Sequence, residues 1–348
     1  MPEVLSLPPG TAITGPWWFF DLLLVVAFAA HLLAVNVALG GTLLALVAPG
    51  AGRGVATALA KRLPVAVAVA VNLAIPPLLF ATVLYGQFLY TAAILSAVAW
   101  LALFLVVMAA YALLYVFQPR AAAPGSGLVA AGAAALLLVA SLTLVNVSVL
   151  SLRPDMWKTA YDFSGGLALA LGDAAFLPRW LHFLVASLAV GGLALALFSR
   201  KAAESDPEAT GRFRLGLNWF RLATLAQIPV GLWFLLSLPR PVRERFFGGH
   251  PLSTLAFLLG LGLAAAALLN AFRGRSGRTA LFTVLTVLAM ATVRDQVRQG
   301  YLAPQFTPES LPAVTQAGPI VLFLGCLAAT AVAAVWAVSS YRRAAQKG

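Results

Sequence analysis

The sequence predicts an all-α polytopic membrane protein with nine transmembrane helices. Of its 348 residues, 61% are hydrophobic and only 10% are charged, and the mean hydropathy is +0.94. A soluble domain usually carries about 25% charged residues, so this composition indicates a membrane protein. Apolar runs long enough to cross a hydrocarbon core of about 30 Å recur along the whole chain. The connections between them are short, and no soluble domain is expected.

Each predicted span corresponds to one of these apolar runs. The first opens with the aromatic residues 17–20, which suit the membrane interface, and it is longer than one span requires. The second and third runs are separated at residues 85–90, and the eighth run is the shortest. A further helix lying on the outer surface is expected within 153–179. The nine predicted spans are 17–47, 64–84, 91–117, 127–150, 177–199, 215–238, 252–272, 279–293 and 318–340.

The formal net charge of +12 is explained by membrane topology. If the N-terminus lies outside, the loops on the inner side hold most of the Lys and Arg residues and few acidic residues. The outer side is then close to neutral. This is the positive-inside distribution of membrane proteins, and it leaves no basic patch that indicates nucleic-acid binding. The prediction is therefore a multi-pass protein of the bacterial inner membrane, with the N-terminus outside and no nucleic-acid partner.

Two distant stretches of the chain, 31–41 and 182–192, are nearly copies of each other. Each begins with a histidine and ends with a Gly-Gly pair, and a single polar residue, Asn36 or Ser187, lies between them. The prolines of the second and sixth spans correspond as well, at Pro76 and Pro229.

This correspondence predicts a parallel internal repeat, because an offset of four helices conserves direction in the membrane. The predicted units are a four-helix bundle at 1–150 and a second four-helix bundle at 151–293. Residues 294–348 then form an outer loop, a ninth helix and a tail on the inner side.

The repeated histidines are candidate axial ligands of b-type haem, one haem or two. A neutral imidazole within a membrane needs a partner, and haem iron is a common one. The alternative is a histidine satisfied by a backbone carbonyl on a packed helix. Each Gly-Gly pair admits either a flat macrocycle or a neighbouring helix. Cys326 is the only cysteine, so any haem is bound non-covalently. The candidate ligands are His31 and His182, and the candidate cofactor-binding glycines are Gly40, Gly41, Gly191 and Gly192.

At these histidine helices the chain resembles subunit I of the cytochrome bd quinol oxidase family. The resemblance implies nine helices with the N-terminus outside, two four-helix bundles plus one helix, and haem histidines on the first and fifth helices. His31 corresponds to the ligand of the high-spin haem and His182 to the histidine of the low-spin haem. It also implies quinol oxidation at the outer loop between the sixth and seventh helices, here 239–250.

The chain also departs from that family at several motifs. The Gly-Arg-Gln-Pro-Trp signature is absent, and 293–298 lies in its approximate place. The methionine ligand of the seventh helix has no counterpart, since 257–260 reads Phe-Leu-Leu-Gly. The third helix lacks glutamate, and the outer loop is short. These differences disfavour an oxygen-reducing oxidase and indicate a reduced relative of the family.

Further residues are candidates for completing the haem and quinone sites. His250 is a candidate sixth ligand, and Met290 is a weaker one that better fits core packing. Arg294 and Arg298 are four residues apart on one helix face and suit haem propionates. The candidate quinone-binding residues of the outer loop are Arg243, Glu244, Phe246 and Phe247, with Glu244 or His250 accepting the proton.

The sequence thus predicts a membrane b-type cytochrome that carries electrons between the quinone pool and a periplasmic partner such as a c-type cytochrome. A second membrane subunit is a further expected partner. One alternative is a haem-free transporter or scaffold built on a parallel repeat. Another is a terminal oxidase with a diverged oxygen site.

Overall fold

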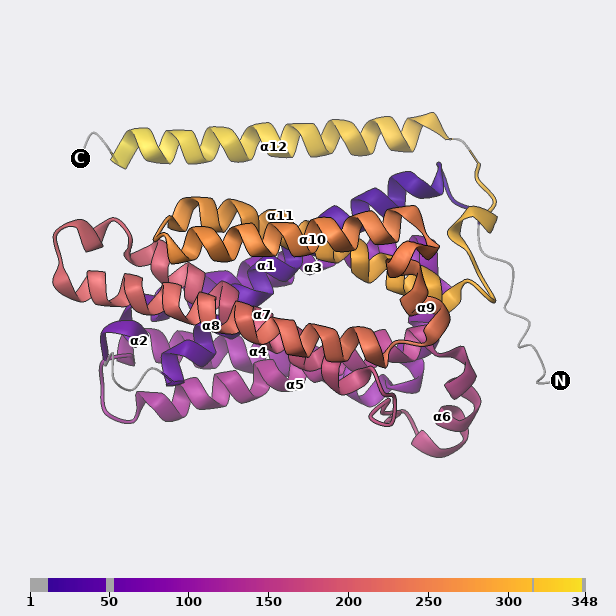
Figure 1. Cartoon of the computed structure of the whole chain (residues 1–348), viewed down its shortest axis with the longest axis horizontal. Coiled ribbons are helices and arrows are strands. Elements are labelled where there is room, and N and C mark those ends of the chain that lie inside the picture. Colours follow the sequence, from indigo (N-terminus) through magenta and orange to yellow (C-terminus); the bar gives the residue numbers. More distant parts are fainter. Residues whose placement is uncertain (1–11, 48–52, 315, 346–348) are drawn as a thin grey trace.

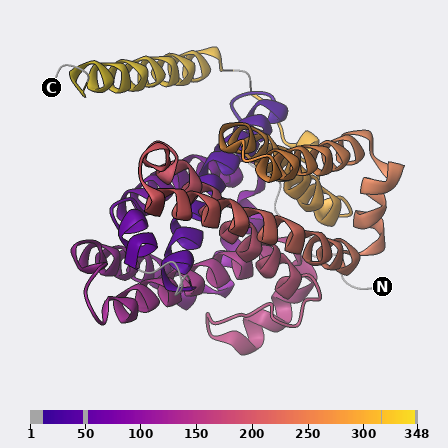
Figure 2. The same cartoon turned by 60° about the vertical axis from the view of Figure 1, so that its left-hand side comes forward.

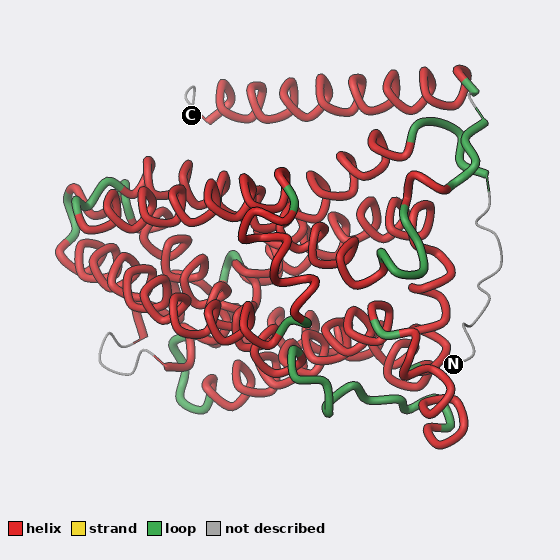
Figure 3. The backbone as a smooth tube through the Cα atoms, turned by 45° about the vertical axis from the view of Figure 1, so that its right-hand side comes forward, coloured by secondary structure: helices red, strands yellow, loops and turns green. Residues whose placement is uncertain are grey.

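The prediction of an all-α multi-pass membrane protein is confirmed by a computed structural model of the chain. The structure describes residues 12–47, 53–314 and 316–345, and helices make up most of these ranges (Figures 1 and 3). Within them, nine helices are long and apolar enough to cross a membrane. They are α1 (Trp17–Val47), α3 (Leu63–Leu95), α4 (Ala97–Arg120), α5 (Ser126–Leu152), α7 (Phe176–Ser199), α8 (Pro207–Ser237), α10 (Pro251–Phe272), α11 (Ser276–Leu302) and α12 (Ala317–Ala345).

Helix α11 continues well beyond the predicted end at residue 293. Residues 294–302, expected in an outer loop, form its last turns. Some of their charged and polar side chains pair within the helix, since Asp295 accepts hydrogen bonds from Arg298 and Gln299. The predicted boundary between the outer loop and the eighth span was therefore wrong.

The break between α3 and α4 also lies later than expected. At Tyr85 the backbone kinks (φ −132°, ψ 26°), but α3 continues to Leu95. The helix ends at Ser96, whose side chain and N–H both donate to the carbonyl oxygen of Ala92. Helix α8 begins earlier than predicted, because the Asp206 side chain accepts a hydrogen bond from the backbone N–H of Glu208 and caps it.

Shorter elements lie at the two ends of the bundle. Helix α2 (Arg53–Ala60), which was not predicted, lies at the end that holds the C-terminus, whereas α6 (Trp157–Ser164) and α9 (Arg240–Glu244) lie at the opposite end (Figure 1). Helix α6 is the surface helix expected within 153–179. A π-helical turn, η3 (Arg245–Gly249), joins α9 to α10, and the 3-10 turn η4 (Pro308–Ser310) follows α11. We call the end with α6 and α9 the outer end.

Helices α1 and α7 form the centre of the molecule. Each contacts the other, and each also packs against α5 and α11. Helix α1 has α3 as its main partner, and α7 has α8, while α4 pairs with α5 and α10 with α11. The two predicted bundles are therefore joined along the contact between α1 and α7.

Helix α12 stands apart from the bundle (Figures 1 and 2). Its described apolar side chains are exposed, including Val321, Leu322 and Trp336. A contact between the rings of Phe80 and Phe323, with centroids 6.1 Å apart, is one of its links to α3. A helix that is apolar on all sides suits a position facing lipid.

Candidate functional site

The repeated glycines lie where the central helices cross. Gly40 and Gly191 face each other, so that a side chain added at Gly40 would collide with the carbonyl oxygen of Ser187. A Cβ at Gly191 would lie 2.5 Å from the carbonyl carbon of Gly40. Only glycine allows the two backbones to approach this closely.

The second glycine of each pair faces a different helix. A Cβ at Gly41 would lie 2.7 Å from the side chain of Leu63 at the start of α3. A Cβ at Gly192 would lie 2.7 Å from the carbonyl oxygen of Gly216 on α8. The Gly-Gly pairs were expected to admit either a flat macrocycle or a neighbouring helix. In the structure all four glycines contact neighbouring helices.

His31 lies on α1 with one ring nitrogen engaged by the protein. Its Nδ1 is 2.9 Å from the carbonyl oxygen of Ala70 on α3. Since a carbonyl only accepts, Nδ1 carries the proton and donates. The lone pair is then on Nε2. This is the tautomer found in metal-ligating histidines, whose other nitrogen donates to a backbone carbonyl.

His182 lies on α7 against the C-terminal part of α8. Its ring contacts Gly231, where an added Cβ would lie 3.2 Å from Cε1, and it is 6.2 Å from the ring of Phe234. Gln227 donates to the backbone carbonyl of His182 at 3.0 Å. Its Nδ1 is buried, and no residue within the described ranges forms a hydrogen bond with it. Such an orphaned nitrogen is costly in the absence of a ligand or partner.

The side chains around both histidines pack loosely compared with the glycine crossing. Residues 40–42 and 191–196 are fully buried, whereas 31–35 and 181–186 are only half-buried on every side of their helices. Yet α1 and α7 are the central helices and each contacts several others. The side chains at the level of the histidines are therefore more exposed than those at the glycine crossing.

Two arginines from different helices meet close to these histidines. The guanidinium of Arg294 lies 4.1 Å above the ring of Phe28, and that of Arg179 lies 5.2 Å from the ring of Phe234. Both lie 3.5 Å from the hydroxyl of Ser148 on α5. Within the part of the chain that the structure describes, neither forms an ion pair with a carboxylate.

The aromatic rings connect these arginines to the histidines. The ring centroids of Phe28 and His31 are 6.4 Å apart, and those of Phe234 and His182 are 6.2 Å apart. A continuous arc therefore runs from one histidine to the other through two aromatic rings and two guanidinium groups. We call it the histidine–arginine arc; its members are His31, Phe28, Arg294, Ser148, Arg179, Phe234 and His182. Guanidinium groups without a carboxylate partner suit the binding of an anionic group.

Arg298, predicted to act together with Arg294, has a different environment. Its Nη1 is 3.0 Å from Asp295, with which it forms an ion pair. Its guanidinium also lies 4.6 Å from the ring centroid of Tyr85 on α3. Of the predicted arginine pair, only Arg294 is therefore available to an anion.

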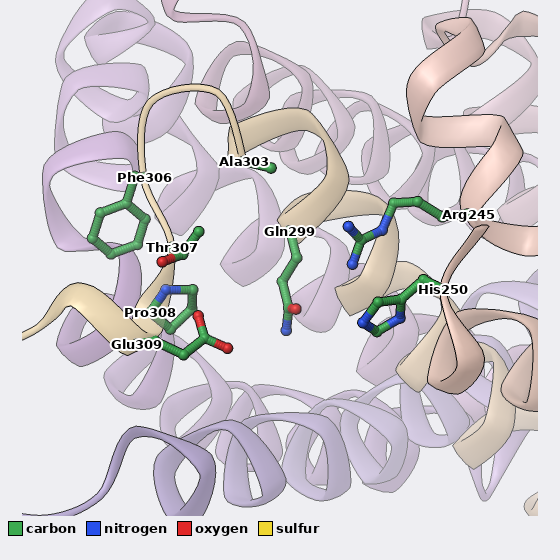
Figure 4. A pocket seen from close by; sticks show the side chains of 8 residues that line it. All are labelled: Arg245, His250, Gln299, Ala303, Phe306, Thr307, Pro308 and Glu309. Carbon is green, nitrogen blue, oxygen red and sulfur yellow. The ribbon is translucent and has the colours of Figure 1, made fainter.

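A polar pocket of about 370 Å³ opens at the outer end between η3, α11 and η4 (Figure 4). Arg245 and His250 face it from one side and Glu309 from another, with Gln299 between them. Nδ1 of His250 is 3.0 Å from the hydroxyl of Ser253. Burial, and then the positive charge of Arg245, lower the pKa of His250 below its usual value, so that the ring is neutral near pH 7. We call this cavity the outer pocket.

The four residues predicted to bind quinone do not line the outer pocket. Glu244 is exposed and pairs with Arg240 at 2.6 Å, and Arg243 donates to a backbone carbonyl of α8. Phe246 is buried in the protein core, while Phe247 is exposed beside Phe257. Arg245, at the start of the π-helical turn, lines the pocket instead, together with His250, which was predicted as a proton acceptor of this loop.

The weaker candidates for haem ligation fill other roles. Met290 packs on α10, where a Cβ at Gly260 would lie 2.5 Å from its Cε, in agreement with the core packing expected for it. His250 has its described contacts in the outer pocket, and none of them is with His182.

Several residues of the site escaped sequence reasoning. Ser148, Phe28 and Phe234 look like ordinary membrane-helix residues, and only the helix packing brings them to the arginines. Asp21, ten positions before His31, was not among the predicted site residues. No model of a known protein family and no curated protein matches the chain.

Proposed function

We propose that the chain is a membrane b-type cytochrome that transfers electrons between the quinone pool and a periplasmic partner such as a c-type cytochrome. The observation that carries the proposal is the histidine–arginine arc, with two available imidazoles and two guanidinium groups that lack carboxylate partners. The resemblance to subunit I of the cytochrome bd quinol oxidases, at the same two histidines, supports it.

In this proposal His31 and His182 would ligate the haem iron, and Arg294 and Arg179 would hold the propionate groups. His31 already donates from Nδ1 to Ala70, which directs Nε2 toward a ligand. When bound, haem supplies one-electron transfer. The aromatic rings of Phe28 and Phe234 hold the two arginines by cation–π contact, so that their guanidinium groups stay oriented. The protein would reside in the bacterial inner membrane, with the outer end facing the periplasm.

The outer pocket is the proposed quinone site. Oxidation of a quinol requires acceptors for its hydroxyl protons, and His250 and Glu309 line the cavity from different sides (Figure 4). Because the pKa of His250 is lowered, its ring is neutral near pH 7 and accepts a proton. Protons taken up here leave toward the outer side. The same groups donate protons if the reaction runs as quinone reduction.

The test is the reduced-minus-oxidised absorption spectrum of the purified protein, together with pyridine haemochrome quantification. We expect a b-type α-band in the wild type and loss of haem in H31A and H182A. H250A is the matched control, because its ring lies in the outer pocket, and it should retain haem. Loss of one haem from each variant indicates two sites, and loss of the same single haem from both indicates a shared site.

The remaining outcomes overturn the proposal. A folded preparation without haem leaves the transporter or scaffold built on a parallel repeat. Oxygen consumption by the purified protein with quinol as the electron donor would instead establish a terminal oxidase.

A further inference from the structure

Two carboxyl groups from distant parts of the chain meet at the outer end of the bundle. Asp21 on α1 lies one turn before Val25, and Asp295 on α11 lies one turn after Ala291. Val25 and Ala291 belong to one packed cluster, so these two helices bring the two carboxyl groups close together. Asp295 is only 3% exposed and already accepts hydrogen bonds from Arg298 at 3.0 Å and from Gln299 at 2.7 Å. These two donors supply Asp295 with hydrogen bonds of the kind that a carboxylate accepts.

Asp21 has a different environment. Its Oδ1 is buried and forms no hydrogen bond with any described residue. A carboxylate oxygen in that position would carry negative charge without a donor, which is expensive in a membrane protein interior. The carbonyl oxygen of a neutral acid carries much less charge. A protonated Asp21 also has the hydrogen needed for the contact with Asp295, since two carboxylates have none.

The surroundings of the pair contain further charged and titratable groups. Tyr85 approaches from α3, and its hydroxyl is buried without a hydrogen-bond partner among the described residues. Arg298 and Arg294 belong to α11, and Glu309 lies on η4. Arg298 is the ion-pair partner of Asp295, and among the described residues Asp21 has no ion-pair partner of its own.

A single side chain separates the pair from the outer pocket. Gln299 donates to Asp295 with its amide nitrogen and also lines the pocket (Figure 4). Glu309, on another side of the same pocket, is close enough to act on Asp21 electrostatically. A proton on Asp21 is therefore buried, but it lies next to a cavity that solvent reaches.

We propose that Asp21 and Asp295 share one proton and form a proton-exchange site that opens to the outer pocket. Release transfers the proton from the Asp21 acid to water in the pocket and leaves a carboxylate, and uptake reverses this step. The exchange responds to charge on the neighbouring Arg294, and this second part rests on the proposed function, in which Arg294 holds a haem propionate. The pair then couples electron transfer to proton movement at the outer end.

The test of the shared proton is infrared spectroscopy of the purified protein near pH 7, in detergent without ester groups. We expect a C=O stretch of a protonated carboxylic acid that shifts in D2O. The band should disappear in D21N. In D295N it should remain but shift in frequency, because the buried Asp21 acid then donates to an amide oxygen instead of a carboxylate. D173N is the matched control: Asp173 is also buried at the outer end, but it is paired with Arg153, so its removal should leave the band unchanged.

A wild-type spectrum without this band overturns the proposal, as does a band that persists in D21N. Size-exclusion chromatography and circular dichroism establish that each variant is folded, and D295N provides a second reading if D21N is not. This measurement needs no haem. A band that behaves as expected in a haem-free protein upholds the proton site while the cytochrome function fails.

The coupling is tested in the haem-loaded protein by redox titration across a range of pH. The wild-type midpoint potential should fall as pH rises, and D21N should flatten this dependence while D173N retains it. Equal slopes in wild type and D21N would overturn the coupling.

Discussion

Ser187 on α7 donates a hydrogen bond to Asn36 on α1, with 2.8 Å between Oγ and Oδ1. These are the corresponding polar residues of the two repeated stretches, and both are fully buried. The bond lies beside the place where Gly40 and Gly191 bring the backbones together. A polar contact and a close backbone approach thus hold the two central helices at one point.

Removing this hydrogen bond should lower the free energy of unfolding only slightly. The effects of the two substitutions should not be additive, because each removes the same hydrogen bond. Double-mutant cycles of hydrogen bonds within membranes average about 0.6 kcal/mol and reach at most about 1.7. We expect a coupling energy in this range for S187A and N36A, measured by reversible unfolding in mixed micelles. A coupling energy of zero would mean that the two side chains act independently.

The glycine crossing should be far less tolerant. G40A introduces a methyl group where the backbone of Ser187 lies, so we expect a loss of about 3 kcal/mol or more in the free energy of unfolding. The matched control is G262A on α10, where no atom lies within 4 Å of an added Cβ. G262A should be neutral or slightly stabilising, because alanine favours helix. Similar losses in both variants would contradict the packing at the crossing.

Removing either arginine of the arc should change the redox behaviour of the haem-loaded protein. R294Q and R179Q each remove a positive charge near the proposed site. Loss of a positive charge stabilises the oxidised haem, because it carries one more positive charge than the reduced haem. The midpoint potential should therefore fall in both variants. R240Q, an exposed arginine paired with Glu244, is the control and should have the wild-type potential. An unchanged potential in both arc variants would place the cofactor elsewhere.

His250 should make the protein less stable in acid. Its pKa is lowered in the folded state, so the unfolded chain binds the proton more readily and stability falls as pH drops through about 6.5. The variant H250Q should lack this component. The ring is partly exposed, so the difference between pH 8 and pH 5 should stay below about 1 kcal/mol. Unfolding free energies of both proteins over this range provide the measurement, and parallel curves would contradict the lowered pKa.

Met290 provides a test of packing against ligation. M290L keeps the volume that fills the space beside Gly260, so the variant should fold with the haem content and spectrum of the wild type. A shifted spectrum would identify Met290 as a ligand.

Apolar length alone was sufficient to predict the nine spans, because each must cross the same hydrocarbon thickness. It was not sufficient for the end of α11. Residues such as Arg294 and Asp295 are charged. In a sequence, charged residues predict a solvent-exposed segment, because the partners that would allow their burial are not visible. Those partners are Ser148 on α5 and Asp21 on α1, which only the packing of distant helices brings near.

The same distinction applies to the site. The histidines and Arg294 were identified from repetition and spacing, which are properties of the sequence. Phe28, Phe234 and Ser148 carry no comparable signal, since their role depends on which faces α5 and α8 turn toward the centre. Likewise, Arg245 and His250 line the outer pocket, whereas Glu244 and Phe246 do not.

The central position of α1 and α7 has a consequence for biosynthesis. Membrane helices emerge from the ribosome in order, and α1 is complete long before α7 begins at Phe176 or α11 at Ser276. Until then the face of α1 that carries Gly40 lacks α7, against which it packs in the finished structure. The nascent first half therefore has no finished centre of its own. Assembly of the histidine–arginine arc must wait until almost the entire polypeptide has been translated.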